Sequence, residues 1–180
     1  MSTSRPLAST TVDTPLGPLT LMASPQGLRI VGWEGEAVGV VSDGGSPLSG
    51  SVPVADRSSA TEILRAAATQ LEEYFRGLRK SFDLPLDPPG TPFQRSAWEV
   101  LRTIPFGHTM TYGEQARRLG GANKARAVGA ANGRNALAII IPCHRVIGAD
   151  GSLTGFSAGV ERKAWLLRHE AEIRGRSDRR

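Results

Sequence analysis

Cysteine and histidine are scarce in this chain, which has one of the former and three of the latter in 180 residues. A single cysteine excludes an internal disulfide and indicates a reducing compartment. One cysteine and three scattered histidines cannot form a tetrahedral zinc site from neighbouring residues, so we expect no metal and no other cofactor. The chain also lacks an apolar run long enough to span a membrane, and residues 1–6 do not resemble a signal peptide. We therefore expect a cytoplasmic protein.

Acidic residues are scarce in the second half of the chain. Residues 1–94 carry 7 basic and 10 acidic side chains, a net charge of −3, whereas residues 95–180 carry 15 basic and 7 acidic ones, a net charge of +8. A basic domain is typical of nucleic-acid binding, although a solvated basic face would give the same charge. Residues 174–180 contribute much of the excess, and we expect this basic tail to be disordered.

Residues 1–89 predict a small α/β domain. Three short alternating segments separated by turns favour an antiparallel meander, at residues 10–13, 19–23 and 28–33. Residues 34–57 are rich in Gly, Ser and Pro, which predicts a long mobile loop with one further strand at residues 37–41.

A helix and a fifth strand are expected to complete this domain. Ser59 and Glu62 have the spacing of a capping box before a run of apolar residues with helical period, and Gly77 is expected to end that helix. Residues 82–86 alternate like a strand. Residues 87–90, with the sequence DPPG, predict the domain boundary.

Residues 90–173 predict a domain of short helices. Thr91, Pro92 and Gln94 combine an N-cap, a proline at the first helical position and a capping glutamine. This helix is expected to end near Arg102. Its inward side chains are expected to be Phe93, Ala97, Val100 and Leu101.

A second helix, a glycine turn and a third helix are expected next. Thr111 and Glu114 form a capping box, and that helix should end at the glycines of residues 120–121. Asn123 is expected to cap a helix over residues 124–132. Two short helices joined by a glycine turn, the second basic, are typical of a helix-turn-helix. Small residues make the second helix slim enough either to enter a DNA groove or to pack tightly against a core; they are Ala125, Ala127, Gly129, Ala130 and Ala131.

The single cysteine, Cys143, lies in the sequence PCHRV at residues 142–146, after an apolar run. A thiol is a nucleophile only as the thiolate, and His144 and Arg145 offer a base and a positive charge beside it. A lone cysteine is more often a small buried apolar residue. Consecutive side chains on a strand point to opposite faces, so Cys143 and His144 can cooperate only if the backbone turns at Pro142 or a water links them.

Several motifs, in the same order along the chain, closely resemble those of the O6-alkylguanine-DNA alkyltransferases. The resemblance covers residues 12–170, and the sequence at residues 14–19 also looks like the opening hairpin of that family. The other shared motifs are TPFQ at residues 91–94, IPFG at residues 104–107 with Tyr112, PCHRV at residues 142–146, and KxxLLxxE at residues 163–170.

This resemblance implies a fold, an activity and a partner. The fold would be a ribonuclease-H-like α/β domain followed by an all-α, winged-helix-like helix-turn-helix domain. The activity would be direct repair of DNA, in which a flipped O6-alkylguanine loses its alkyl group irreversibly to the cysteine in a single turnover. The partner would be duplex DNA, bound in the minor groove with little regard to sequence. We expect a monomer and leave open repair of O4-alkylthymine and cooperative binding.

The resemblance also implies a role for individual residues. Cys143 would be the nucleophile and alkyl acceptor, His144 would take its proton through a water, and Glu170 would orient the imidazole. Tyr112 would donate a hydrogen bond to the leaving guanine. Arg126 would occupy the space left by the flipped nucleotide.

Further residues would shape the turn, the pocket and the DNA contact. Asn135 would brace the turn before the cysteine, and Ser157 would lie near the guanine O6. The remaining expected pocket and structural positions are Pro142, Arg145, Val146, Gly155 and Phe156. The other expected DNA-contacting positions are Asn123, Lys124, Ala125, Ala127, Gly129 and Ala130. Two positions depart from the family pattern in ways that bear on pocket breadth, because Ala136 replaces a frequent proline and Phe156 a common tyrosine.

Three alternatives remain beside this hypothesis. Alkyltransferase-like lesion sensors resemble the second half but lack the nucleophile, so Cys143 argues against them. A helix-turn-helix regulator with an incidental cysteine would bind one sequence and ignore alkylation. A cysteine hydrolase would need an acyl pocket, for which the sequence gives no sign. His108 and His169 are interpreted as an ordinary loop and surface histidine.

Overall fold

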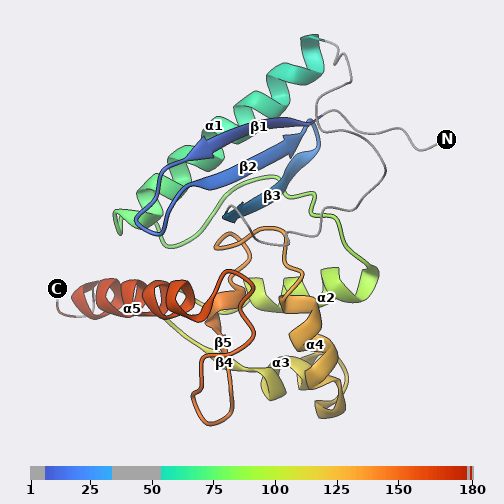
Figure 1. Cartoon of the computed structure of the whole chain (residues 1–180), viewed down its shortest axis with the longest axis vertical. Helices are drawn as coiled ribbons and strands as arrows, with labels where there is room; N and C mark the ends of the chain where they lie inside the picture. The colour runs from blue at the N-terminus through green and yellow to red at the C-terminus, as the bar shows by residue number, and fades with distance from the viewer. Residues whose placement is uncertain (1–6, 34–53, 178, 180) are drawn as a thin grey trace. The chain divides into compact units, whose positions relative to one another are not determined.

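The computed structural model describes residues 7–33, 54–177 and 179, and it divides the chain into two compact units, Met1–Pro89 and Gly90–Arg180 (Figure 1). The predicted strand at residues 37–41 and nearly all of the loop predicted at residues 34–57 lie outside the described part. In the described residues, no helix is both long and apolar enough to cross a membrane.

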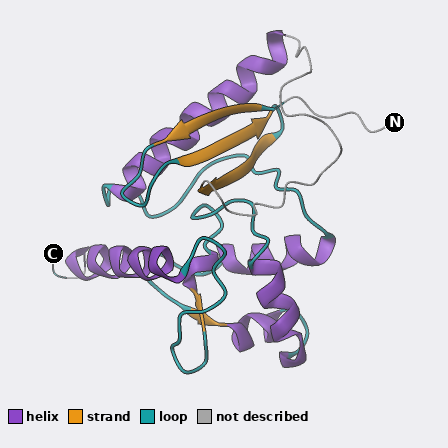
Figure 2. Ribbon diagram, in the orientation of Figure 1, coloured by secondary structure: helices purple, strands orange, loops and turns teal. Residues whose placement is uncertain are grey.

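The first unit contains a three-stranded antiparallel sheet in the order β1-β2-β3 (Figure 2). The strands are β1 (Ala8–Val12), β2 (Leu19–Ser24) and β3 (Gly27–Trp33), which confirms the predicted meander. Leu21 lies opposite Val31, and both are buried, so the apolar residues of neighbouring strands share one face.

The helix α1 (Val54–Phe75) runs along this sheet and contacts all three strands. Its buried side chains recur with helical spacing, as the sequence predicted; they are Ala60, Leu64, Ala67, Leu71 and Tyr74. The predicted start at Ser59 is wrong, because the helix already begins at Val54. Residues 54–58 contain neither glycine nor proline, so nothing in them stops the helix from extending past the apparent capping box.

The end of α1 follows the prediction. Gly77 has a φ of 73°, the left-handed region that favours glycine. Its amide donates to the carbonyl of Tyr74 at 2.9 Å, and the amide of Leu78 donates to the carbonyl of Glu73 at 2.8 Å. This pattern is a Schellman motif, which satisfies two carbonyl groups at the end of the helix.

The predicted strand at residues 82–86 is wrong, since only a single bridge between Leu28 and Leu86 forms. The amide of Leu28 donates to the carbonyl of Pro85 at 2.8 Å, and the amide of Asp87 donates to the carbonyl of Leu28 at 2.9 Å. Pro85 has no amide hydrogen, so the segment cannot continue a ladder of hydrogen bonds along β3.

The second unit begins with α2 (Pro92–Arg102) and α3 (Tyr112–Arg118), whose predicted capping boxes are both present. Of the side chains expected to face inward in α2, Ala97 and Leu101 are buried, whereas Phe93 and Val100 are half-buried. Trp98 was not predicted to face inward, yet it is almost fully buried.

The turn between α3 and the next helix differs from the prediction. Gly120 and Gly121 have φ values of 98° and 152°, and a 3₁₀ turn, η1 (Ala122–Lys124), follows them. The helix α4 (Ala125–Asn132) begins without a side-chain cap, so the expected role of Asn123 as N-cap is wrong. Asn123 lies inside η1, where the amide of Lys124 bonds to the carbonyl of Gly121 at 3.1 Å and the backbone itself closes the turn.

The remaining elements include the turn that carries the cysteine. They are β4 (Met110–Thr111), the 3₁₀ turn η2 (Cys143–Arg145), β5 (Val146–Ile147) and α5 (Val160–Ser177). The parallel pairing of β4 with β5 was not predicted, because a strand of two residues has no detectable period.

The predicted disordered tail is also wrong for its first part, because α5 continues to Ser177. The guanidinium of Arg174 donates to the carbonyl of Gly107 at 2.6 Å, and Ile173 is buried. These contacts hold the last turns of the helix, which net charge alone did not reveal.

Candidate active site

Cys143 lies at the start of η2, where the chain turns directly after Pro142. Its side chain is 7% exposed. The side-chain Nδ2 of Asn135 donates to the carbonyl of Ile141 at 2.7 Å and to the Cys143 sulfur at 3.1 Å. Its Oδ1 accepts from the backbone amide of Leu137 at 3.0 Å. Asn135 therefore ties both ends of the preceding loop to the thiol.

This loop contains the only positive φ of a non-glycine residue in the described part of the chain. Ile139 has a φ of 70° and is buried. For a β-branched residue this conformation costs on the order of 1–3 kcal/mol and persists only where the surroundings fix it. The hydrogen bonds of Asn135, and the amide of Ile141 donating to the carbonyl of Leu137 at 2.9 Å, provide that restraint.

His144 is fully buried, with its Nε2 2.8 Å from Oε1 of Glu170. Its Nδ1 is buried and forms no hydrogen bond with a protein atom in the described residues. Burial lowers the pKa of His144 below its ordinary value of 6.5, against the opposing hydrogen bond and charge of Glu170. The imidazole is thus neutral at pH 7. With Nε2–H donating to the carboxylate, Nδ1 is left with a lone pair that can accept a proton.

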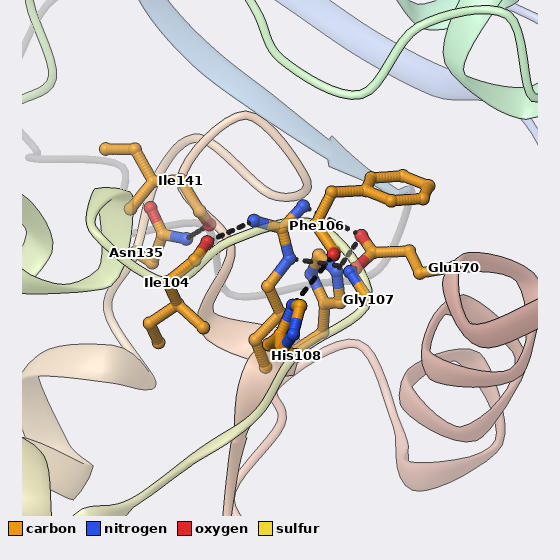
Figure 3. Close-up of polar contacts among 9 residues, drawn as sticks. Ile104, Phe106, Gly107, His108, Asn135, Ile141 and Glu170 are labelled. Atoms are coloured by element: carbon orange, nitrogen blue, oxygen red, sulfur yellow. Dashed lines mark hydrogen bonds and ion pairs between the residues drawn. The ribbon is translucent and has the colours of Figure 1, made fainter. Parts of the chain in front are cut away.

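Glu170 reaches from α5 toward the segment that carries Gly107, as Figure 3 shows. It accepts hydrogen bonds from Nε of Arg145 at 2.9 Å, from Nη2 of Arg145 at 3.0 Å and from the amide of Gly107 at 2.9 Å. Burial alone would raise the pKa of Glu170, but its hydrogen bonds and charge interactions with His144 and Arg145 outweigh this and hold that pKa well below its usual range. The carboxylate is therefore ionised throughout the physiological range.

The hydrogen bonds of Arg145 go to Glu170 and to the backbone of the segment at residues 104–107. Besides its two bonds to Glu170, its Nη1 donates to the carbonyl of Ile104 at 2.6 Å, and its guanidinium lies 5.7 Å from the centre of the Phe106 ring. The side chain thus joins η2, α5 and the IPFG segment, residues 104–107, around one carboxylate.

Tyr112 and Lys163 meet at one carbonyl near the cysteine. The Tyr112 hydroxyl and the Lys163 ammonium donate to the carbonyl of Thr154 at 2.9 and 2.7 Å. Burial, and then the charge of Cys143, raises the pKa of Tyr112, so the phenol remains a hydrogen-bond donor. Burial lowers the pKa of Lys163, and the charge of Cys143 opposes that shift. The two side chains and Cys143 are therefore close enough to interact electrostatically.

Lys163 is a candidate functional residue to which sequence reasoning assigned no role. Its side chain is fully buried, and no ion pair with a carboxylate forms in the part of the chain that the structure describes. Lys163, Leu166 and Glu170 follow the i, i+3, i+7 spacing of one helical face, and all three are buried. That spacing was the available signal, because a lysine on the inward face of a helix seldom lacks a purpose.

The expected pocket wall lies beside Tyr112. A Cβ atom at Gly155 would lie 2.5 Å from the Tyr112 hydroxyl, and the φ of Gly155 is 68°, so only glycine fits there. Phe156 is buried, whereas Ser157 is exposed. The structure thus brings Gly155 to Tyr112, whereas no hydrogen bond within the described residues draws Ser157 into the cluster.

The helix α4 presents small residues and one arginine to solvent. Exposed positions in η1 and α4 are Ala122, Asn123, Arg126, Ala127 and Ala130, whereas Lys124, Ala125 and Gly129 are half-buried. A Cβ at Gly129 would lie in ordinary contact with the Tyr112 ring, at 3.9 Å. The ammonium of Lys124 donates to the carbonyl of Leu119 at 2.7 Å and closes the turn before α4. The surface predicted to contact DNA therefore adjoins the predicted pocket.

The other two histidines contact groups other than Cys143, His144 and Glu170. His108 is exposed, with Nδ1 3.2 Å from the carbonyl of Phe106. The ring of His169 stacks on Trp165 with ring centres 4.8 Å apart. No group of three or more potential metal ligands occurs within the described residues.

Comparison with known proteins identifies the family. The sequence model of the 6-O-methylguanine DNA methyltransferase DNA-binding domain matches residues 92–172, and that of its ribonuclease-like domain matches residues 7–88. A methylated-DNA–protein-cysteine methyltransferase of Methanosarcina acetivorans is 44% identical over 159 residues, which are 88% of this chain and 94% of the relative. The chain belongs to this methyltransferase family.

Other members of the methyltransferase family agree. A methylated-DNA–protein-cysteine methyltransferase of Shigella flexneri is 44% identical over 169 residues, covering 90% of this chain and 94% of the relative. The crystal structure of Mycobacterium tuberculosis OGT in complex with DNA is similar with a TM-score of 0.75 and 40% identity, covering 91% of this chain and 92% of that one. These similarities confirm the predicted fold class, a ribonuclease-like domain followed by a helical DNA-binding domain.

Proposed function

We propose that this methyltransferase repairs O6-alkylguanine in duplex DNA by transferring the alkyl group to Cys143 in a single, irreversible turnover. The observation that carries the proposal is the arrangement of η2, which places Cys143 next to a neutral, fully buried His144 whose partner is the ionised Glu170. A nucleophile, a base and a group that orients the base occur together in this way in enzymes that use covalent catalysis.

The chemical step balances with residues of this chain and the damaged base. The thiol proton passes through a water to Nδ1 of His144, and Glu170 stabilises the resulting imidazolium. The sulfur attacks the alkyl carbon, the bond from that carbon to O6 breaks, and the electron pair passes to the guanine. Tyr112 donates a hydrogen bond to a ring nitrogen of the leaving guanine. The imidazolium then returns the thiol proton through water to the guanine, which leaves as the neutral base, and His144 is neutral again. The thioether has no leaving group, so the cysteine is not regenerated.

Access to the base is proposed to come from α4. The helix would enter the minor groove with its exposed small residues, and Arg126 would occupy the space of the flipped nucleotide. Extrusion of a paired base costs a few kcal/mol, and a side chain that fills the gap offsets part of that cost.

A synthetic duplex with one O6-methylguanine tests the proposed function. After incubation and enzymatic digestion, the nucleosides should show deoxyguanosine in place of the methylated nucleoside, with intact strands and no free base. A Cys143→Ala variant should leave the lesion unchanged. Release of a free base or a strand break would contradict direct reversal.

Arg126→Ala is expected to slow repair of duplex DNA by more than ~10-fold, equivalent to about 1.4 kcal/mol. The same variant should react with free O6-benzylguanine at nearly the wild-type rate, because a free base needs no extrusion. Arg117→Ala removes the same charge from an exposed position on α3 and serves as the matched control, with a smaller loss. Equal losses of Arg126→Ala on both substrates would show that the side chain supports the pocket or the fold.

The pH dependence of transfer to the free base should reflect the lowered pKa of His144. Burial and the charges of Arg145 and Lys163 lower this pKa, and Glu170 opposes them. The imidazole is active as a base when neutral, so the decline of the rate with falling pH should be centred below 6.5. A decline centred at or above pH 6.5, measured from rates of modification of Cys143, would contradict a neutral buried base.

A further inference from the structure

Two buried amide side chains connect α3 to α4. Nδ2 of Asn132 donates to Oε1 of Gln115 at 2.8 Å, and Nε2 of Gln115 donates to Oδ1 of Asn132 at 3.1 Å. Nε2 of Gln115 also donates to the carbonyl of Ala97 in α2 at 3.1 Å. Gln115 is 0% and Asn132 3% exposed, so this reciprocal pair is shielded from water.

These amides stand apart from the other buried polar groups of the second unit. Within its described residues, the other buried polar side chains are His144, Arg145, Lys163 and Glu170, and all of these belong to the active-site cluster. Burial of polar groups is unfavourable unless they are hydrogen-bonded, and apolar side chains would fill the same space at no such cost. The contribution of the two amides is therefore the directional hydrogen bonds between them, which apolar side chains of the same size could not make.

A short series of hydrogen bonds leads from the pair to the nucleophile. The backbone amide of Asn135 donates to the carbonyl of Asn132 at 3.1 Å, and the side-chain amide of Asn135 donates to the Cys143 sulfur at 3.1 Å. Nε1 of Trp98 donates to the carbonyl of Ala131 at 2.9 Å and fixes the same end of α4. Arg126 lies on α4, and the C-terminal end of this helix is thus held at the point from which the chain continues to the cysteine.

We propose that Gln115 and Asn132 are positioning residues that set the register of α4 against α3, so that Arg126 and Cys143 act on the same flipped nucleotide. Apart from Asn132, the buried face of α4 consists of the small side chains Val128 and Ala131. Such side chains interlock only weakly with a neighbouring helix, so they do little to prevent α4 from sliding along α3. Directional hydrogen bonds between two amides select one register, as buried polar residues do in other helix pairs. The proposal rests on the proposed function.

The test replaces the pair in two ways. In Gln115→Met/Asn132→Leu, both amides become apolar groups of similar size. The cost in stability should be small, because neither amide is left unpaired and only the bond from Gln115 to the carbonyl of Ala97 is lost in addition. In Gln115→Asn/Asn132→Gln, the amides are exchanged and their total length is kept. Rates are measured on duplex DNA containing O6-methylguanine and on free O6-benzylguanine, and thermal unfolding is followed in parallel.

The apolar variant should unfold cooperatively within a few degrees of wild type. It should react with the free base at nearly the wild-type rate but repair duplex DNA about 10- to 100-fold more slowly, since small misplacement of reacting groups has effects of this size. The exchanged variant should recover most of the duplex rate. A purely structural pair would move both rates together.

Three results would overturn the inference: an apolar variant that repairs duplex DNA as fast as wild type, one that loses both activities equally, or one that no longer unfolds cooperatively. The last would show that the pair serves stability. A wild-type protein that modifies Cys143 with neither substrate would instead contradict the proposed function, so the two failures are distinguishable.

Discussion

His144→Ala is expected to slow alkyl transfer by about 10²–10⁴-fold on duplex DNA and free base alike, the usual contribution of a positioned base. The imidazole is fully buried, Nε2 is held by Glu170, and Nδ1 is the atom left to accept a proton. The fold should tolerate the change, because Glu170 keeps its bonds to Arg145 and Gly107. Single-turnover rates of Cys143 modification measure the effect.

Glu170→Gln should also slow transfer, and the double variant should lose far less than the product of the two single losses. Residues that act as one relay are non-additive in this way. Fully multiplicative losses would show that His144 and Glu170 act separately. Glu170→Gln also removes the partner of Arg145, so its unfolding must be measured beside its rate.

Arg145→Met is expected to reduce the free energy of unfolding by about 3–5 kcal/mol, the usual cost of removing one partner of a buried ion pair. Arg145 and Glu170 side chains are 7% and 0% exposed, so the carboxylate would remain buried without its guanidinium. Urea unfolding of the full chain measures the loss. The double change Arg145→Met/Glu170→Gln should recover part of it, because no uncompensated charge then remains.

Arg102→Met is the matched control for that measurement. Arg102 pairs with Glu99 at 3.1 Å on the surface, with side chains 45% and 68% exposed. An exposed pair of this kind contributes less than about 1 kcal/mol. Similar losses for Arg102→Met and Arg145→Met would contradict the importance assigned to the buried cluster around Glu170.

Local signals in the sequence predicted much of the fold. The capping boxes at Thr91 and Thr111 were confirmed, because the backbone of each threonine is extended and the helix begins at the next residue. The same pattern at Ser59 failed, since preceding residues without a breaker carry the helix back to Val54. Asn123 failed as a cap because a 3₁₀ turn closed by backbone bonds precedes α4. The start of a helix is thus predictable where a residue that stops the helix precedes it, and less so where another helical turn or a helix-compatible segment precedes it.

The part of the site that consists of residues adjacent in the sequence could be predicted. Cys143 and His144 are neighbours in sequence, and the family motif added Glu170. The partner of Arg145 and the burial of Lys163 were not predicted, because they depend on where α5 packs against η2. The Gln115–Asn132 pair was missed for the same reason, since its two members lie on different helices.

The intact mass of the protein after mixing with duplex DNA containing O6-methylguanine tests the central claim most directly. With lesions in excess, every chain should gain one methyl group and no more, on the peptide that contains Cys143, and Cys143→Ala should gain none. The number of repaired guanines should equal the number of modified chains. Unmodified protein beside repaired DNA, or more repaired guanines than protein molecules, would contradict irreversible transfer to Cys143.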